Sequence, residues 1–299
     1  MQDLFDQALF AHRRDRALAL GFDGGADFLH RAVADSLGER LSAVRRDFHD
    51  VVVVGTQGGI VPAALAGQLA GATFRLFDPS PGIADRSGAI WYAGETMPIG
   101  EGCADLVISS LLLHHLNDPV GHLIQLRRAL RSDGLLLVAS FGGQTLVELR
   151  SAFAEAESRL MGGLTPRVSP MAEIRDLGGL LQRAGFALPV ADSEPIRVSY
   201  PTALHLMRDL RAMGETNVLV SRSRKPTGRK IFDLSTEIYR EHFASGDGVR
   251  ASFDLIFLTG WAPAPGQQKA LRPGSAATRL AEALDTFEVP AGEKAGPDG

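Results

Sequence analysis

Two adjacent histidines, His114 and His115, are the side chains of this chain that best suit acid–base chemistry near neutral pH. They follow the apolar run 105–110, which predicts a buried strand, so both lie where that strand meets its loop. One interpretation of these histidines is that either acts as a general base or holds an adenine or a substrate group, and the other is that they are hydrogen-bonded loop histidines. The sequence spacing supplies no carboxylate that would complete a metal site with these histidines, so no metal site is expected.

The segment 51–59 joins four valines to a glycine-rich turn. Consecutive valines predict a strand that is buried on both faces, and a helix-like run follows the turn. Strand, glycine turn and helix open a nucleotide-binding α/β fold, in which Gly55 and Gly59 let the backbone approach a ligand. Gln57 puts a side chain where a ligand commonly needs space, so a tight turn without a ligand is the alternative.

Asp78 closes the next predicted strand, 73–77, and follows the glycine turn by roughly 20 residues, the usual spacing for an acid that binds a ribose. A carboxylate at this place can accept hydrogen bonds from both ribose hydroxyls. A plain turn is the alternative, because Asp-Pro-Ser is a common turn sequence. Ser109 and Leu111, at the end of the strand over 105–110, are expected to line the same cofactor site.

Apolar periodicity predicts strands that alternate with helices, which is typical of a mostly parallel sheet covered by helices on both faces. The expected strands are 51–55, 73–77, 90–93, 105–110, 135–141, 187–199 and 251–261, and the expected helices are 3–20, 26–48, 60–70, 118–131, 144–161, 171–184, 201–214 and 230–243.

We expect three regions: an N-terminal helical extension over 1–48, an α/β domain over 49–262, and a poorly ordered tail over 263–299 that is rich in Pro, Gly and Ala. A helical insertion, about 200–248, precedes the last strand of the domain. The extension carries a basic cluster, 12–16, which is either a solvated helix face or a docking surface for an acidic partner or substrate.

Two polar blocks, 162–170 and 207–217, follow the fifth strand, where this fold places elements that cover a substrate. In the first block, glycines and prolines surround an arginine, which indicates a shaped loop. A structural lid without catalytic residues is the alternative. The candidates for substrate contact are Arg167, Ser169, Tyr200, Arg208, Glu215 and Asn217.

Composition narrows the class of protein. The chain has 299 residues, of which 45% are hydrophobic, and a net charge of −4, so no global field favours nucleic acid or an anionic membrane. Cys103 is the only cysteine, which excludes a disulfide within the chain and fits a reducing compartment. The first residues include acids and do not resemble a signal peptide, and no apolar run is long enough to span a bilayer, so we expect a cytoplasmic protein.

With these residues in view, the chain resembles the class I methyltransferases that depend on S-adenosylmethionine. The landmarks are the acid after the second strand, the loop 111–118 and the segment 130–134 before the fifth strand. Within that superfamily it is most similar to the complex I assembly factors of mitochondria and α-proteobacteria, which are arginine hydroxylases. It is more distantly similar to the malonyl-carrier-protein methyltransferases of biotin synthesis. The more specific matches are 4–6, 141–150, 162–170, 176–178, 183–186 and 207–217.

The resemblance implies a Rossmann-like, seven-stranded, mostly parallel sheet with N-terminal helices and a helical insertion before the last strand. It implies S-adenosylmethionine as cofactor, and either of two partners. One is the iron–sulfur subunit of complex I, on which an arginine beside the quinone site is hydroxylated. The other is an acyl-carrier protein, whose bound acyl chain is methylated on a free carboxyl. Val53 and Gln57 replace the acid and glycine that are usual in the superfamily, so a scaffold without ligand binding is the third alternative.

Overall fold

The structure, a computed structural model, describes residues 3–21, 25–267 and 278–287. These residues belong to two separate units, 1–264 and 265–299. The second unit contributes one short helix, α10 (Leu280–Ala283). Most of the tail expected over 263–299 lies outside the described residues, so its order stays a prediction. None of the helices in the described ranges is long and apolar enough to cross a membrane.

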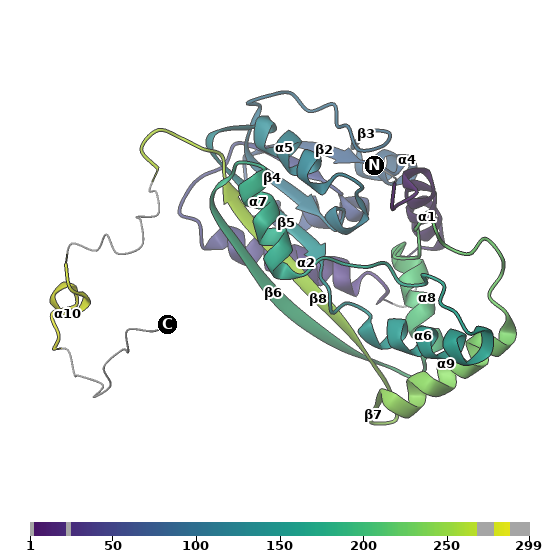
Figure 1. Ribbon diagram of the computed structural model, residues 1–299. Helices are drawn as coiled ribbons and strands as arrows, with labels where there is room; N and C mark the ends of the chain where they lie inside the picture. Colours follow the sequence, from purple (N-terminus) through teal and green to yellow (C-terminus); the bar gives the residue numbers. More distant parts are fainter. Residues whose placement is uncertain (1–2, 22–24, 268–277, 288–299) are drawn as a thin grey trace. The chain divides into compact units, whose positions relative to one another are not determined.

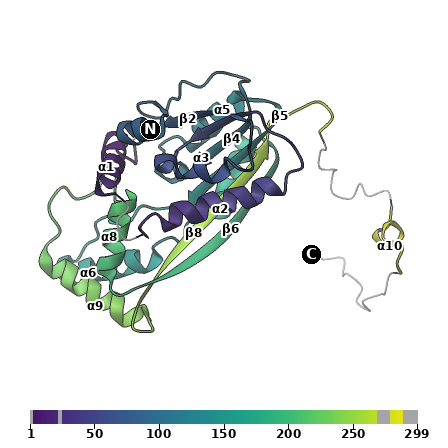
Figure 2. The same cartoon turned by 180° about the vertical axis from the view of Figure 1, so that it is seen from behind.

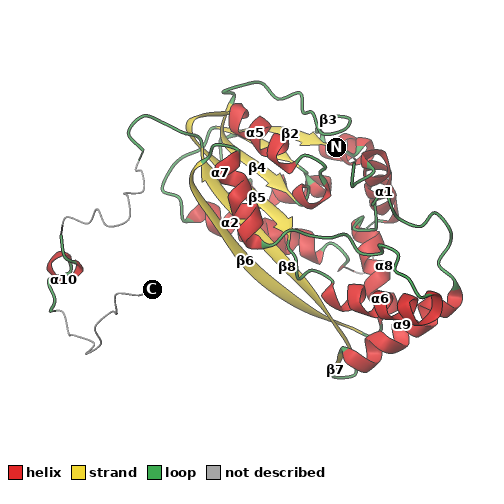
Figure 3. Ribbon diagram, in the orientation of Figure 1, coloured by secondary structure: helices red, strands yellow, loops and turns green. Residues whose placement is uncertain are grey.

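One sheet organises the first unit, and eight strands of the described residues take part in it, in the order β3-β2-β1-β4-β5-β8-β6 with β7 at the end of β8. The first five strands are parallel, and β8 runs antiparallel to both β5 and β6 (Figures 1 and 3). The mostly parallel Rossmann-like sheet is therefore confirmed, with the two-residue β7 as an addition. The strands are β1 (Asp50–Val54), β2 (Thr73–Asp78), β3 (Ile90–Trp91), β4 (Ala104–Ser110), β5 (Leu130–Phe141), β6 (Ala187–Tyr200), β7 (Ala244–Ser245) and β8 (Gly248–Trp261).

The valine run forms β1 at the centre of this sheet, and all four valines have 0% exposure. Val51 and Val53 belong to the core on one face, which is covered by α2 (Phe28–Ser42) and α3 (Ile60–Leu65). Val52 and Val54 belong to the core on the opposite face, which is covered by α5 (Pro119–Ala129) and α7 (Ile174–Arg183). Figure 1 shows α5 and α7 in front of the sheet, and Figure 2 shows α2 and α3 in front from behind. Burial of each valine stabilises the fold by roughly 1.5 to 3 kcal/mol.

Local sequence explains where the first helices begin and end. Asp6 caps α1 (Gln7–Leu20) by accepting a hydrogen bond from the Leu9 amide, and Gly21 ends the helix with φ 77°. Asp118 caps α5 in the same way, and Pro119 occupies its first turn. These caps fix the entry of α1 and α5 into the fold.

Three further helices gather beyond the carboxyl ends of the parallel strands: α6 (Val147–Met161), α8 (Ala203–Met213) and α9 (Arg229–His242). The helix α6 packs on α9, and α1 packs on both α8 and α4 (Pro81–Ser87). The long strands β6 and β8 carry the chain out to this group, as Figure 1 shows. Together with α1, these helices form the walls of the space above the carboxyl edge of the sheet.

A buried histidine, His122, joins α5 to β4 within the core. It is 1% exposed, and its Nε2 lies 3.0 Å from the hydroxyl oxygen of Ser109. Burial lowers the pKa of His122 to about 4, because the interior disfavours the charged imidazole. The side chain is therefore neutral in the folded protein at neutral pH.

This burial predicts a loss of stability in acid. Below the ordinary pKa of about 6.5 the unfolded chain binds a proton at His122, whereas the folded chain binds it only near pH 4, so the free energy of unfolding falls as the pH decreases between these values. In His122→Phe, the loss of stability from pH 8 to pH 4.5 should be smaller than in wild type by roughly 2 kcal/mol. Urea unfolding at both pH values measures it. His205→Phe, at an exposed position of α8, is the control, and equal pH dependence in all three proteins would contradict the prediction.

Candidate functional site

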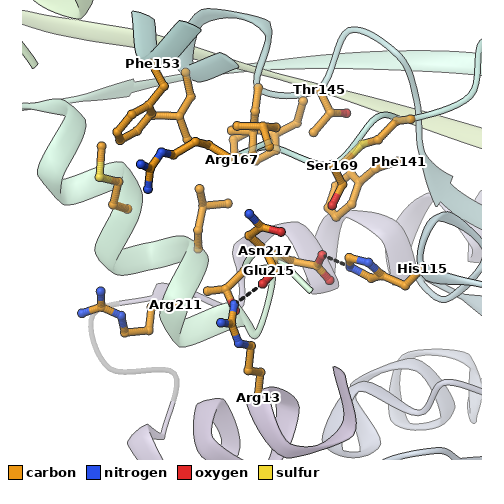
Figure 4. Close-up of a pocket in the computed structure, with 18 of the residues that line it drawn as sticks. Arg13, His115, Phe141, Thr145, Phe153, Arg167, Ser169, Arg211, Glu215 and Asn217 are labelled. Carbon is orange, nitrogen blue, oxygen red and sulfur yellow. Dashed lines mark hydrogen bonds and ion pairs between the residues drawn. The ribbon is translucent and has the colours of Figure 1, made fainter. Parts of the chain in front are cut away.

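A pocket of about 600 Å³ lies between α1, α6 and α8 at the end of β5. Its apolar lining includes Phe141 and Phe153, and Figure 4 shows the polar side chains that converge on it from several elements. Pockets of this size accommodate a side chain or a small ligand, and they lie where this fold usually binds one, at the carboxyl ends of the strands.

Three ionisable side chains meet at the inner end of this pocket. The Oε2 atom of Glu215 lies 3.2 Å from Nε2 of His114 and 2.9 Å from Nε2 of His115. The side chains are 1%, 3% and 6% exposed for His114, His115 and Glu215. Both His115 and Glu215 line the pocket, and Figure 4 marks their contact with a dashed line.

Charge is distributed unevenly in this cluster. Burial opposes ionisation of Glu215, but the two imidazoles more than offset it, so the pKa of Glu215 lies well below its usual range. Burial, together with the neighbouring His115, lowers the pKa of His114 to about 4. At neutral pH the cluster therefore contains a carboxylate and a neutral His114 that can donate a hydrogen bond to it.

The short 3₁₀ helix η3 (Leu113–His115) directs both imidazole rings toward Glu215. The ring of His114 packs against Phe141 at 4.9 Å, and that of His115 packs against Phe10 at 4.7 Å, measured between ring centroids. The side chain of Gln7 donates a hydrogen bond of 2.7 Å to the carbonyl of His115. The N-terminal segment and the end of β5 thus fix the rings from two sides.

The glycine turn after β1, unlike the histidine–glutamate cluster, is closed by a side chain of the protein. Gly55 has φ 79°, and a Cβ atom at this position would come 2.4 Å from the carbonyl oxygen of Ser110, so only glycine fits. The side chain of Gln57 is folded into the turn, 2% exposed, and donates a hydrogen bond of 3.0 Å to the same carbonyl. The turn is thus closed by the side chain that stands in place of the usual glycine.

Asp78, the acid expected at a ribose, is 0% exposed. Its Oδ2 accepts hydrogen bonds from the amide and hydroxyl of Thr56, at 2.9 and 3.2 Å, and lies 3.4 Å from Nη2 of Arg14. Its Oδ1 accepts a hydrogen bond of 3.0 Å from the amide of Ser80. No ribose hydroxyl can reach this carboxylate, so the residues in this conformation do not fit S-adenosylmethionine.

The other predicted cofactor residues lie apart from the pocket as well. Ser109 and Leu111 have 0% exposure, and Gly59 borders a separate hollow beside α2. None of the six predicted cofactor residues lines the pocket of about 600 Å³. Their role in binding a cofactor stays a prediction.

The basic cluster of α1 holds this arrangement together. A solvated face is the wrong interpretation for Arg14, which is 2% exposed and paired with Asp78. Arg13 donates hydrogen bonds to the Thr216 hydroxyl at 2.8 Å and to the Asn217 carbonyl at 2.5 Å. Asp15 accepts a hydrogen bond of 2.8 Å from the amide of Gly82 in α4. The helix therefore ties Asp78, α4 and the loop after α8 to one another.

Four of the predicted substrate residues line the pocket, namely Arg167, Ser169, Glu215 and Asn217. The guanidinium of Arg167 is paired at 2.6 Å with Glu157, which is 0% exposed. The remaining two, Tyr200 and Arg208, are not brought to it, because Tyr200 packs in the core and Arg208 is exposed on α8. Their role stays a prediction.

Sequence reasoning missed the carboxylate partner of the two histidines, since Glu215 lies 100 residues from His115 in the chain. It also missed Arg13, Arg16 and Arg211 as pocket residues. A signal existed for the first two in the basic cluster 12–16, and for Arg211 in the polar block 207–217.

Comparison with known proteins identifies the family. A family model described as a methyltransferase domain matches residues 25–189, more than half of the chain. The chain belongs to the methyltransferase-domain family. This methyltransferase-domain protein is 32% identical over 287 residues to the mitochondrial arginine-hydroxylase NDUFAF5 of Danio rerio, covering 94% of this chain and 89% of that protein. It is 31% identical to NDUFAF5 of Homo sapiens, covering 94% and 83%.

A second group of relatives has a different activity in its name. The malonyl-[acyl-carrier protein] O-methyltransferase of Laribacter hongkongensis is 32% identical over 278 residues, covering 87% of this chain and 91% of that protein. Among solved structures, a methyltransferase-like protein of Bacillus halodurans aligns with TM-score 0.52 at 17% identity, covering 77% of this chain and 98% of that one. YcgJ of Bacillus subtilis aligns with TM-score 0.52 at 12% identity, covering 77% and 99%. These two similarities concern the fold of the methyltransferase-domain protein.

The pair of Arg14 with Asp78 in this methyltransferase-domain protein predicts a large stability effect. Replacing Arg14 by Ala should lower the free energy of unfolding by about 3 kcal/mol, because it leaves a fully buried carboxylate without its cation. Chemical denaturation measures the change. Arg16→Ala, at an exposed position of the same helix, should change stability by no more than about 0.5 kcal/mol.

The double variant Arg14→Ala/Asp78→Asn separates the charge effect from lost packing. Removing the buried charge together with its partner should restore part of the stability lost in Arg14→Ala. If Arg14→Ala is as stable as Arg16→Ala, the pair does not hold α1 in place.

Proposed function

We propose that this chain is an enzyme that hydroxylates an arginine side chain of a protein subunit during assembly of respiratory complex I. The proposal is supported by the similarity to arginine-hydroxylase NDUFAF5 over nearly the whole chain. The single structural observation that carries it is the contrast between Asp78, which is closed off under α1, and the polar cluster at Glu215, which faces the pocket. The chemistry is therefore assigned to His114, His115 and Glu215, away from the glycine turn.

The pocket suits a long side chain with a cationic end. The aromatic side chains of its lining offer surface for the aliphatic part of an arginine and faces on which a guanidinium can stack. Arg13 and Arg167 also line it, but both are bonded, to Asn217 and Glu157. The carboxylate of Glu215 at the inner end supplies negative charge in a nearly dry environment, where electrostatic attraction is strong.

Hydroxylation places limits on what the pocket must hold. One oxygen atom of dioxygen is inserted into a C–H bond of the arginine, and the other leaves as water after taking up two electrons from a reductant and two protons. The chain's own part is to position the arginine, to exclude bulk water and to supply polar groups at the reacting carbon. The walls formed by α1, α6 and α8 would provide the first two, and the histidine–glutamate cluster would provide the third.

A specific observation favours a second candidate, O-methylation of a malonyl group on an acyl-carrier protein. Arg16 and Arg211 line the pocket, are exposed, and form no ion pair within the described residues. Free guanidinium groups at a pocket attract carboxylates and phosphates, which a carrier-bound malonyl chain has. This candidate requires S-adenosylmethionine, and so requires α1 to release Asp78 first.

The acceptor decides between the two candidates. In one assay, purified protein is incubated with dioxygen, a reductant and the iron–sulfur subunit of complex I. In the other, it is incubated with S-adenosylmethionine and a malonyl-carrier protein. Mass spectrometry identifies the product of each assay. We expect the mass of one oxygen atom on an arginine of the first acceptor, reduced at least about 100-fold in Glu215→Gln. His205→Ala, on the exposed face of α8, is the matched control. Methylation of the carrier-bound chain without arginine hydroxylation would refute the main proposal.

Cofactor binding is tested independently by calorimetry. Because Thr56 and Arg14 occupy the carboxylate of Asp78, S-adenosylmethionine should bind wild-type protein no more tightly than the millimolar range. Micromolar binding that Asp78→Ala abolishes would show instead that α1 opens and that the cofactor site forms.

Deletion of the gene gives the matching biological readout: loss of complex I under the main proposal and a requirement for biotin under the second. A cytoplasmic location is part of the proposal, since a single cysteine fits a reducing compartment.

A further inference from the structure

Among the described residues, His114, His115 and Glu215 are the only three metal-ligand side chains whose ligand atoms all lie within 4.8 Å of one another. They come from two separate elements, the 3₁₀ helix η3 and the loop after α8. Nothing in the spacing of the sequence brings them together, because the carboxylate lies 100 residues beyond His115. The fold creates this group.

We propose that His114, His115 and Glu215 bind one divalent transition-metal ion, whose remaining coordination positions open into the pocket. The donor set decides the class of ion. Two imidazole nitrogens and one carboxylate suit Fe²⁺, Co²⁺ or Zn²⁺, whereas Mg²⁺ and Ca²⁺ require mainly oxygen ligands. Two histidines with one carboxylate and open positions are also the ligand set of non-haem iron sites.

The distances in the cluster fit a shared ion. Two ligands that each lie about 2.1 Å from one ion at a right angle are about 3 Å apart. The carboxylate oxygen Oε2 of Glu215 lies 2.9 and 3.2 Å from the two Nε2 atoms, so both nitrogen–oxygen pairs already have this separation. Hydrogen bonds hold the three ligands together until an ion replaces the shared protons.

A second oxygen atom of Glu215, which has no hydrogen-bond partner in the described part of the chain, gives an independent reason to expect a metal ion. The second carboxylate oxygen of Glu215, Oε1, is buried and has no hydrogen-bond partner among the described residues, in a side chain that is 6% exposed. A buried carboxylate oxygen without a donor is unfavourable, and a cation would satisfy it. Because Glu215 lines the pocket, an ion beside it has access from that side.

The surroundings hold the ligands in place. The Oγ atom of Ser140 lies 3.4 Å from Nδ1 of His114, and the amide of Phe141 donates to the same nitrogen at 3.5 Å, so this ring is held by polar contacts outside the ligand set. Phe141 and Phe10 pack against the two rings and restrict their rotation. Such support from outside the ligand set is what keeps a metal site in one geometry.

The open side of the site faces Arg13 and Arg16, which line the same pocket. An ion held by only one carboxylate keeps a net positive charge, so its free positions favour an oxygen ligand. The inference concerns metal binding alone and holds for either acceptor considered above.

Metal uptake by untagged, full-length protein tests the proposal directly. After removal of metal with a chelator and dialysis, Co²⁺ is titrated and its visible absorption bands are recorded, with Zn²⁺ competition to give affinity. We expect one Co²⁺ per chain in wild type, and at least about 100-fold weaker binding in Glu215→Gln and in His115→Asn. Glu215→Asp, which keeps the carboxylate, should bind with intermediate affinity.

His205→Ala, which removes an exposed imidazole from α8, should bind Co²⁺ as wild type does. Circular dichroism and thermal unfolding establish that each variant is folded, and where Glu215→Gln does not fold, His115→Asn carries the test. Absence of Co²⁺ uptake by wild type overturns the proposal, as does uptake that Glu215→Gln and His115→Asn leave unchanged. Because the readout is absorption and not turnover, a negative result here leaves the proposed hydroxylation to be judged by its own assay.

Discussion

The buried ion pair between Arg14 and Asp78 is the contact on which the arrangement of the site depends. Both side chains are removed from water, at 2% and 0% exposure, and burial of two charges is costly unless each finds partners. Asp78 finds them in the amide groups of Thr56 and Ser80 as well as in Arg14. If either Arg14 or Asp78 were removed, the other charge would be left uncompensated. The pair therefore holds α1 against the carboxyl edge of the sheet.

Once α1 is fixed there, other residues along the same helix reach the histidine–glutamate cluster. One turn of helix from Arg14, Phe10 packs on the ring of His115, and Gln7 binds the carbonyl of the same residue. Arg13, on the adjacent face, holds the loop that carries Glu215 through its bonds to Thr216 and Asn217. The helix that covers Asp78 thus also holds the histidine–glutamate cluster in place, so the two arrangements depend on each other.

The sequence was sufficient for the sheet because its signals are local. The run Val51–Val54 predicts a strand buried on both faces, and each of these valines has 0% exposure. Individual pocket residues could be predicted within single loops or polar blocks, as for His115, Arg167 and Glu215, but the contacts between distant segments could not. Glu215 reaches His115 through the path of β6 and α8, and Arg14 reaches Asp78 through the packing of α1 on α4, so neither contact has a period or a spacing that a sequence would show.

The turn after β1 is stabilised by contacts within the protein and does not need a ligand to keep its shape. In this fold the glycine turn normally leaves room for a cofactor. Here the amide of Gln57 occupies that room and donates to the carbonyl of Ser110, so the buried backbone group is satisfied from within the protein. The valine core holds the turn whether or not a ligand is present, since its stability derives from burial and not from the cofactor. The strand–turn–helix unit can therefore persist without a ligand, and the proposed chemistry lies at the neighbouring strand end, where His114 and His115 meet Glu215. Assignment of methyl transfer from the fold alone would rest on the part of the molecule whose polar groups are already occupied.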